Sequence, residues 1–377
     1  MPISQLLCNL VHSLIDVISI LNWILSWNKI SFSLETITIK DIARALNLST
    51  STVSRALRNS YEINIETKKL VMEYAERMNY RPNPIALSLR DSKSKSIGVI
   101  IPEIANNFFS QLINGIESIA YNLGYHVVIF QSHESYEREV ANTNYLVSRK
   151  VDGLLVSLSS LTTNLHHFEE LMEKGLPIVF FDRVPNDIET HKVVADNFFG
   201  SYEATEHLIK SGRRRIAHIT SPIYLSITTE RLAGYKKALE DYSIPFDESY
   251  VKYCHHGGKL VSENEAAVQE LLDMAEPPDA IFPASDRLTT GCLAVLIKNN
   301  IRIPDEIAIV GFTNIGVAEL LNPPLTAVVQ PAMEMGQQAV ELLINLIEHP
   351  KKTSSFETRS FKTSLIIRES SAGKVHA

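Results

Sequence analysis

The sequence predicts two parts of different fold class, an all-α head of three helices and an α/β body that occupies most of the chain. In the head, apolar side chains recur with a period near 3.6. Beyond Ser96, short apolar runs alternate with amphipathic segments, a pattern that predicts doubly wound parallel sheets. With 377 residues, 45% of them apolar, the chain can bury two or three separate cores.

The head begins with two short helices joined by a tight turn, in the stretch TIKDIARALNLSTSTVSRALRNS. Thr38 can cap the first helix, Asn47 can end it, and a second helix starts at Ser49 or Thr50. A third helix is expected over residues 66 to 79. The apolar positions expected to form the common core are Ile39, Ile42, Ala43 and Leu46, then Val53, Ala56 and Leu57, then Leu70, Val71, Tyr74, Ala75 and Met78.

The exposed face of the second helix offers small hydroxyls and arginine, including Arg58. Side chains of this kind suit the phosphates and base edges of a DNA major groove. Any small amphipathic helix pair has a similar spacing, so the pattern alone leaves a purely structural helix pair open. The residues of the head that we predict to contact double-stranded DNA are Thr38, Thr50, Ser51, Thr52, Ser54 and Arg55.

The distribution of charge agrees with a DNA-binding head, although the net charge of the chain is -7. Residues 35 to 95 carry eleven Lys and Arg against seven Asp and Glu, a local charge of +4. Residues 96 to 377 carry 24 against 35, or -11. The positive part is the part predicted to contact phosphate, and a negative body would be repelled by DNA.

Four motifs identify a family. TIKDIA, STVSRAL, YRPNPIA and SKSIGVI occur in the order and spacing of the lactose/galactose repressor (LacI/GalR) family of bacterial transcription regulators. The chain resembles this family from Thr36 to about Glu369. The resemblance implies a homodimer on a pseudo-palindromic operator and a periplasmic-binding-protein-like body of two lobes. The lobes would be joined by crossovers near Ala195, Val328 and Arg359, with a small effector in the cleft.

The segment after the third helix would be the hinge helix and linker of this family, over residues 82 to 95. In the family, the hinge folds when two subunits meet on an operator, and a leucine wedges into the minor groove. Leu89 occupies that place, although a linker residue packed on the body is the alternative. The hinge residues that the resemblance places on DNA are Asn83, Ala86, Leu89 and Arg90.

The body contains seven continuously apolar runs, a pattern typical of parallel strands that are buried on both faces. The runs are IGVIIP, HVVIF, DGLLVSL, PIVFFD, RIAHIT, DAIFPAS and IAIVGF. Helices are expected between them over residues 108–123, 137–149, 165–174, 200–211, 230–242, 263–274 and 289–299. The chain is therefore expected to divide into an apolar extension (1–34), a helix-turn-helix domain (35–81), the hinge (82–95) and an effector-binding and dimerisation domain (96–377). Within the last domain, lobe 1 would comprise residues from about 96–194 and 332–359, and lobe 2 residues from about 195–328 and 360–377.

Ligand residues are expected just after the strands, where parallel sheets present their binding sites. Carboxylate, amide and guanidinium groups around an aromatic face suit a sugar, whose hydroxyls need donors and acceptors. In the loop GFTN, Thr313 and Asn314 stand where family members often have an acid, so no particular sugar is indicated. The expected ligand-binding residues are Phe109, Asp182, Arg183, Asn197, Arg231, Asp286 and Thr313.

The first 34 residues are apolar but do not match a signal peptide, because no Lys or Arg precedes the apolar run and four polar residues interrupt it. An interaction or membrane-surface helix is one interpretation. We favour translation from a start near Leu34.

These features predict a cytoplasmic, dimeric, ligand-responsive regulator, in particular a repressor of carbohydrate-utilisation genes. A solute-binding protein for transport is the alternative, although it would need no DNA-binding head. An enzyme is not expected, since no nucleophile elbow, phosphate loop or metal-ligand spacing is found, and no cofactor or membrane partner is expected. The dispersed cysteines, Cys8, Cys254 and Cys292, predict neither a disulfide nor a metal site.

Overall fold

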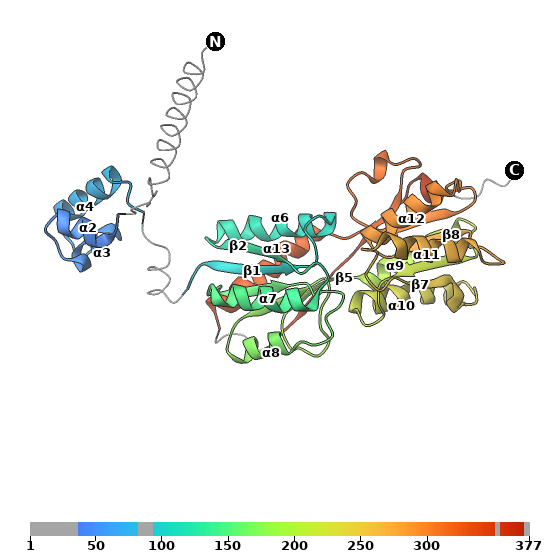
Figure 1. Ribbon diagram of the computed structural model, residues 1–377, viewed down its shortest axis with the longest axis horizontal. Coiled ribbons are helices and arrows are strands. Elements are labelled where there is room, and N and C mark those ends of the chain that lie inside the picture. The colour runs from blue at the N-terminus through green and yellow to red at the C-terminus, as the bar shows by residue number, and fades with distance from the viewer. Residues whose placement is uncertain (1–36, 82–92, 351–354, 373–377) are drawn as a thin grey trace, which may run out of the picture. The chain divides into compact units, whose positions relative to one another are not determined.

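The computed structural model describes residues 37–81, 93–350 and 355–372 (Figure 1). The chain divides into two compact units, Met1–Leu87 and Ser88–Ala377. We describe each unit separately. In the described residues, no helix is both long enough and apolar enough to cross a membrane.

The first unit contains three short helices, α2 (Ile39–Ala45), α3 (Thr50–Leu57) and α4 (Ile65–Arg77). The side chains of Ser49 and Asn64 cap α3 and α4 by accepting from the N–H groups of Thr52 and Thr67. The three helices enclose one small core, whose fully buried members are Ile42, Ala43, Val53, Ala56, Val71 and Ala75.

Two residues expected in this core lie outside it. Leu70 is 49% exposed and Met78 is 39% exposed. Helix α4 turns Val71 and Ala75 toward α2 and α3. Because each helical residue is rotated by about 100° from the next, Leu70 cannot share the buried side with Val71 in a core this small.

Lobe 1 of the second unit is built on a six-stranded parallel sheet in the order β11-β5-β4-β3-β1-β2. Helices α6 and α13 cover one face of the sheet, and α7 and α8 cover the other (Figure 1). The bounds are β1 (Ser96–Ile101), α6 (Asn107–Asn122), β2 (His126–Gln131), α7 (Tyr136–Ser148), β3 (Gly153–Val156), α8 (His166–Glu173), β4 (Ile178–Phe181), β5 (Lys192–Ala195), α13 (Ala332–Glu348) and β11 (Thr358–Phe361).

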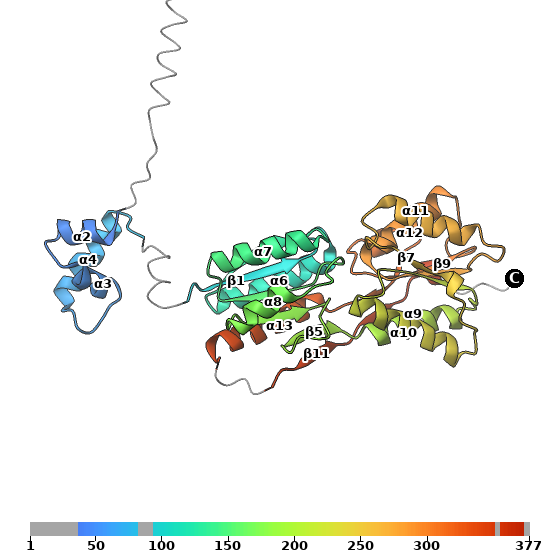
Figure 2. The ribbon, with the colours of Figure 1, turned by 60° about the horizontal axis from the view of Figure 1, so that its bottom comes forward.

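Lobe 2 has a second six-stranded sheet in the order β12-β10-β9-β8-β6-β7, in which only β12 runs antiparallel. Helices α9 and α10 pack on one face, and α11 and α12 on the other (Figure 2). The bounds are α9 (Asn197–Lys210), β6 (Ile216–Thr220), α10 (Ser226–Asp241), β7 (Val251–Tyr253), α11 (Val261–Leu272), β8 (Ala280–Pro283), α12 (Asp286–Lys298), β9 (Ala308–Phe312), β10 (Thr326–Val329) and β12 (Ser364–Ile366), with short 3-10 turns at Glu248–Tyr250, Ala318–Leu320 and Glu369–Ser371.

The chain passes between the lobes three times, after β5, after β10 and after β11. The last passage follows Phe361 rather than Arg359, because residues 358 to 361 pair with β5. Strand β2 is also not buried on both faces, since it lies at the edge of its sheet and is partly exposed. The elements that the expected runs did not include are β5, β7, β10, β11, β12 and the long helix α13.

Candidate functional site

The exposed face of α3 presents a hydroxyl cluster at its N-terminus. The Ser49 hydroxyl lies 2.7 Å from the Ser51 hydroxyl and 2.8 Å from the Thr52 hydroxyl. Thr50 and Ser51 are exposed, whereas Thr52 is half-buried. The N-terminus of a helix with exposed hydroxyls favours a phosphate oxygen, because the helix N–H groups carry partial positive charge.

Arg55 in α3 and Arg58, the residue that follows the helix, each contact a neighbouring group. The Arg55 guanidinium lies 3.1 Å from the Glu62 carboxylate, and both side chains are about half exposed. The Arg58 Nε donates to the Ser54 carbonyl and an Arg58 Nη donates to the Ser54 hydroxyl. Arg58 thus engages Ser54, which limits how freely Ser54 can reach DNA.

The remaining predicted DNA contacts divide into two cases. Thr38 precedes α2, and its backbone N–H and hydroxyl both donate to the Asp41 carboxylate, at 3.0 and 2.6 Å. Its hydroxyl is therefore committed to the helix start in this structure. The four hinge positions, Asn83, Ala86, Leu89 and Arg90, lie outside the described residues.

In the second unit, a small cavity of about 40 Å³ lies between the lobes. Five of the seven expected ligand residues line it: Phe109, Asp182, Arg183, Arg231 and Asp286. The other two, Asn197 and Thr313, contact residues of this group. Lining residues that the sequence analysis did not name are Asn106, Phe108, Ile227, Ser285, Phe312 and Gln330.

Arg231 is a buried cation at the centre of this cleft. Its Nε donates to the Asn197 side-chain oxygen at 2.9 Å, an Nη donates to the Ala284 carbonyl, and the guanidinium lies 3.7 Å from the centre of the Phe312 ring. Burial lowers the pKa of Arg231 to about 10, so it stays charged at neutral pH. Helix α10 starts at Ser226 rather than at Glu230, which places Arg231 in its second turn.

Asp286 presents one free carboxylate oxygen. Its Oδ1 accepts from the Thr313 hydroxyl and from the Asn314 N–H at 2.9 Å. Its Oδ2 is buried and has no hydrogen-bond partner among the described residues. Burial raises the pKa of Asp286. Thr313 and Asn314 thus orient the carboxylate, and Oδ2 is the atom available to a ligand hydroxyl.

Asp182 and Arg183 line the cavity from lobe 1, and Arg183 pairs with Glu134 behind them. Asp182 is buried at a φ of +59°, a strained conformation for a non-glycine residue, and burial raises the pKa of its carboxyl. An Arg183 Nη lies 2.7 Å from the Glu134 carboxylate, with 13% and 9% of the two side chains exposed. Burial opposes the Glu134 charge, but the Arg183 charge and the bonds to Ser160 leave the pKa of Glu134 lowered.

Glu134 was not predicted, although the rule used for the other positions could have found it, because it follows β2.

Several buried polar atoms that follow the strands have no hydrogen-bond partner among the described residues. These atoms include Ser132 Oγ, Ser157 Oγ, Ser160 Oγ, Arg183 Nε, Asp286 Oδ2 and Gln330 Nε2. The last three belong to residues that line the cavity. An unpaired buried polar group costs about 1 to 3 kcal/mol, so a polar ligand in the cavity would gain by pairing them.

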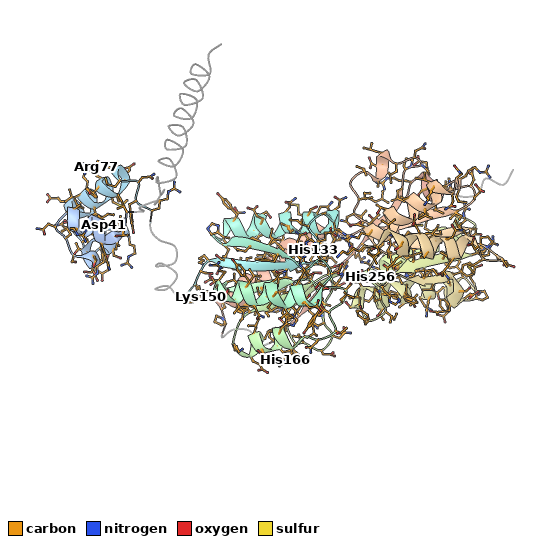
Figure 3. All side chains as sticks on the ribbon, in the orientation of Figure 1. Asp41, Arg77, His133, Lys150, His166 and His256 are labelled. Carbon is orange, nitrogen blue, oxygen red and sulfur yellow. The ribbon has the colours of Figure 1, made fainter. Side chains whose placement is uncertain are left out.

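Polar contacts bridge the two lobes around the cavity. Asn314 donates to the Gln111 side chain at 3.1 Å, and the Lys259 ammonium donates to the carbonyl of His133, a residue at the end of lobe 1 that faces lobe 2 (Figure 3). The Tyr224 hydroxyl also donates to the Ser160 carbonyl. Since 40 Å³ is about the space of one water, a larger ligand requires these contacts to shift.

Comparison with known proteins agrees with both parts. The family model described as bacterial regulatory proteins, lacI family, matches residues 38–83, and the periplasmic binding protein-like domain matches residues 205–371. The HTH-type transcriptional repressor PurR of Vibrio atlanticus is 32% identical over 320 residues, covering 84% of this chain and 94% of the relative. The repressor CytR of Escherichia coli is 32% identical over 334 residues, covering 88% and 96%.

Solved structures show the same similarity. The transcriptional regulator CelR in complex with cellobiose has 30% sequence identity and a TM-score of 0.66, covering 89% of this chain and 99% of that one. The lac repressor dimer bound to operator and an anti-inducer has 22% identity, a TM-score of 0.76 and coverage of 90% and 100%, which supports the fold.

A helix-turn-helix head joined to a two-lobed binding body defines a ligand-responsive, DNA-binding transcriptional regulator. The chain belongs to the LacI family of bacterial regulatory proteins. The predicted family and fold class are confirmed, and nothing found supports the alternative of a transport protein.

Proposed function

We propose that the chain is a dimeric, cytoplasmic repressor of carbohydrate-utilisation genes. In this proposal the head, residues 35–81, reads a pseudo-palindromic operator through α3, while Leu89 and its hinge neighbours enter the minor groove. The body, residues 96–377, binds a sugar-like effector between its lobes without chemical conversion. Support comes from relatives named as repressors, and from similar regulators solved with cellobiose or with ribose.

The observation that carries the choice of effector class is the chemistry of the cleft. Phe109 and Ile227 offer apolar surface. Among the described residues, the acceptor Asp286 Oδ2 and the donors Gln330 Nε2 and Arg183 Nε have no hydrogen-bond partner. A sugar has C–H faces that stack on aromatic rings and hydroxyls that both donate and accept. The hydroxyls of a neutral sugar ring can therefore pair both the unpaired acceptor and the unpaired donors of the cleft.

The effector regulates DNA binding only if it favours one arrangement of the lobes over another. The contacts that bridge the lobes in this structure, such as Asn314 to Gln111, are the ones that an entering sugar would exchange. Closure of the cleft would then decide how far apart the two hinges of a dimer lie.

A thermal-shift screen of mono- and oligosaccharides tests the effector class. A ligand at a hundred times its dissociation constant stabilises the folded state by about 2.7 kcal/mol, which is readily detected. Each sugar that shifts the melting temperature is then added to a gel-shift assay on a duplex that the wild-type protein selects from a random-sequence pool.

Asp286→Asn should abolish the thermal shift, while Glu265→Gln, which changes a half-exposed carboxylate on α11 that pairs with Lys298, should not. An unchanged midpoint in Asp286→Asn would contradict the cleft assignment. Turnover of the sugar by the wild-type protein would contradict a binding function without catalysis.

A further inference from the structure

The chain enters lobe 1 from the hinge through Lys93, Ser94 and Lys95, and Asp152 fixes the backbone of this segment. Asp152 Oδ1 accepts from the Ser94 N–H at 2.7 Å and from the Ser94 hydroxyl at 3.0 Å. Asp152 Oδ2 accepts from the Lys95 N–H at 2.8 Å. Hydrogen bonds to a charged acceptor are the stronger kind, so the path of the backbone at residues 94 and 95 is well defined.

A second carboxylate, Glu348, holds the side chains of the same segment. Its Oε2 accepts from the Lys93 ammonium at 2.8 Å, and its Oε1 accepts from the Lys95 ammonium at 2.8 Å and from the Tyr125 hydroxyl at 2.6 Å. Lys95 also lies 4.3 Å from the centre of the Tyr125 ring. We call Asp152, Glu348 and Tyr125 the hinge anchor.

Two of these residues stand at the far ends of helices that begin at the cleft. Phe108 and Phe109, which line the cavity, lie in the first turn of helix α6, and Tyr125 follows the end of this helix. Gln330, which also lines the cavity, precedes helix α13, and Glu348 is the last residue of that helix. Helices of 16 and 17 residues are about 25 Å long. In Figure 3, Lys150, two residues before Asp152, lies at the opposite end of lobe 1 from His133.

The two helices are packed backbone to backbone. A Cβ at Gly115 of α6 would come within 2.1 Å of the Met333 carbonyl oxygen of α13, and a Cβ at Gly336 within 2.1 Å of the Leu112 carbonyl oxygen. Helices this close leave no room for sliding, because neither backbone can yield independently. They behave as one rigid pair that joins the cleft to the hinge anchor.

We propose that Glu348 is a positioning residue for operator binding, which fixes the point where each hinge leaves the body and ties that point to the α6–α13 pair. The proposal rests on the proposed function of a dimer on an operator. In a dimer, the effective concentration of the second head at its half-site depends on the geometry of its tether. Fixing the backbone where the hinge joins lobe 1 raises this effective concentration, and releasing that backbone lowers it.

The test compares Glu348→Gln with Glu341→Gln. Glu341 is an exposed carboxylate on the same helix, so its variant has the same change in charge without touching the hinge anchor. Affinity is measured on the duplex selected by the wild-type protein and on a scrambled duplex. Amide hydrogen exchange is measured over residues 93 to 97.

We expect Glu348→Gln to lose about tenfold in affinity for the selected duplex and to exchange faster at residues 94 and 95. Affinity for the scrambled duplex and all properties of Glu341→Gln should match the wild type. The melting temperature should stay within about 3 °C, because half-exposed ion pairs contribute little to stability. If Glu348→Gln does not fold, Tyr125→Phe is tested in its place. It should also weaken binding to the selected duplex, but by less than tenfold.

Faster amide exchange at residues 94 and 95 in Glu348→Gln, together with wild-type affinity for the selected duplex, would overturn the proposal. Release of this segment would then have no effect on operator binding. Unchanged exchange, or equal losses on the two duplexes, would overturn it as well. A wild-type protein that selects no duplex would instead overturn the proposed function, on which the role of Glu348 depends.

Discussion

The two ends of lobe 1 use charged residues in opposite ways. At the cleft, Arg183 and Glu134 are almost fully buried, and nearby polar atoms lack partners among the described residues. At the hinge anchor, Lys93 and Glu348 are about one-third exposed, and the carboxylate oxygens of Glu348 and Asp152 are all occupied. The cleft thus contains buried polar atoms without partners among the described residues, whereas the carboxylate oxygens of the hinge anchor are paired.

This difference predicts where substitutions act on stability and where they act on function. A charge buried without its partner is costly, whereas a half-exposed charge is readily hydrated. Substitutions in the cleft wall should therefore affect folding as well as ligand binding, and those at the hinge anchor should affect DNA binding with little effect on folding.

The largest effect is expected from Glu134→Ala, which leaves the Arg183 guanidinium buried without its carboxylate. The free energy of unfolding should fall by about 3 to 5 kcal/mol in urea denaturation. The double variant Glu134→Leu, Arg183→Met should recover most of the loss, since it buries no unpaired charge. A loss below 1 kcal/mol in the single variant would show that water reaches Arg183 and that this end of the lobe resembles the hinge anchor.

Gly336→Ala tests the rigid connection between the two ends. The added Cβ meets the Leu112 backbone, so the α6–α13 pair must separate, at a cost of about 3 kcal/mol measured by the same denaturation. Gly316→Ala is the control, because a Cβ there meets no atom within 4 Å. Equal stability of the two variants would mean that the helices can move apart freely.

A smaller effect, confined to DNA, is expected in the head. Arg55→Ala should weaken binding to the selected duplex by about 1 to 3 kcal/mol, because one charge-assisted contact is lost. Lys69→Ala, on the exposed side of α4, should leave the affinity unchanged. Wild-type affinity of Arg55→Ala in a gel-shift titration would show that α3 does not face the groove.

The smallest effect concerns the pH dependence of the hinge anchor. Bonds from Lys93, Lys95 and Tyr125 lower the pKa of Glu348 to about 2. A lowered folded-state pKa adds stability above the unfolded value of about 4.3, and this contribution is lost as pH falls through 2. Because the Glu348 side chain is 35% exposed, solvent screens the ion pair and the contribution is small. The difference in urea midpoint between wild type and Glu348→Gln should stay constant from pH 5 to 8, decrease between pH 5 and 2, and vanish below pH 2. A difference that changes between pH 5 and 8 would contradict this ion pair.

Much of the fold could be predicted from local patterns. The helix pair of the head follows from its apolar period and from caps such as Ser49, and the parallel strands follow from apolar runs such as PIVFF. The rule that ligands lie after parallel strands selected Asp182 and Asp286, and the family resemblance selected Arg231; all three line one cavity in the structure. These are features in which neighbours in sequence determine the outcome.

Other features depend on contacts between distant residues. Sequence placed Leu70 and Met78 in the core, but only the packing of three helices decides which side of α4 is buried. Helix α13 was overlooked, and with it the pairing of Glu348 with Lys93, 255 residues away in the chain.

The sequence by itself determined the family, the two fold classes and five of the eleven residues that line the cavity, because motifs, helical period and apolar runs are local properties. Tertiary structure alone decided that Asn197 contacts Arg231, that Thr313 contacts Asp286, that Glu134 pairs with Arg183, and that Glu348 pairs with Lys93 and Lys95. The physical reason is that burial and charge pairing depend on which segments the folded chain brings together, and spacing along the sequence does not encode those distances.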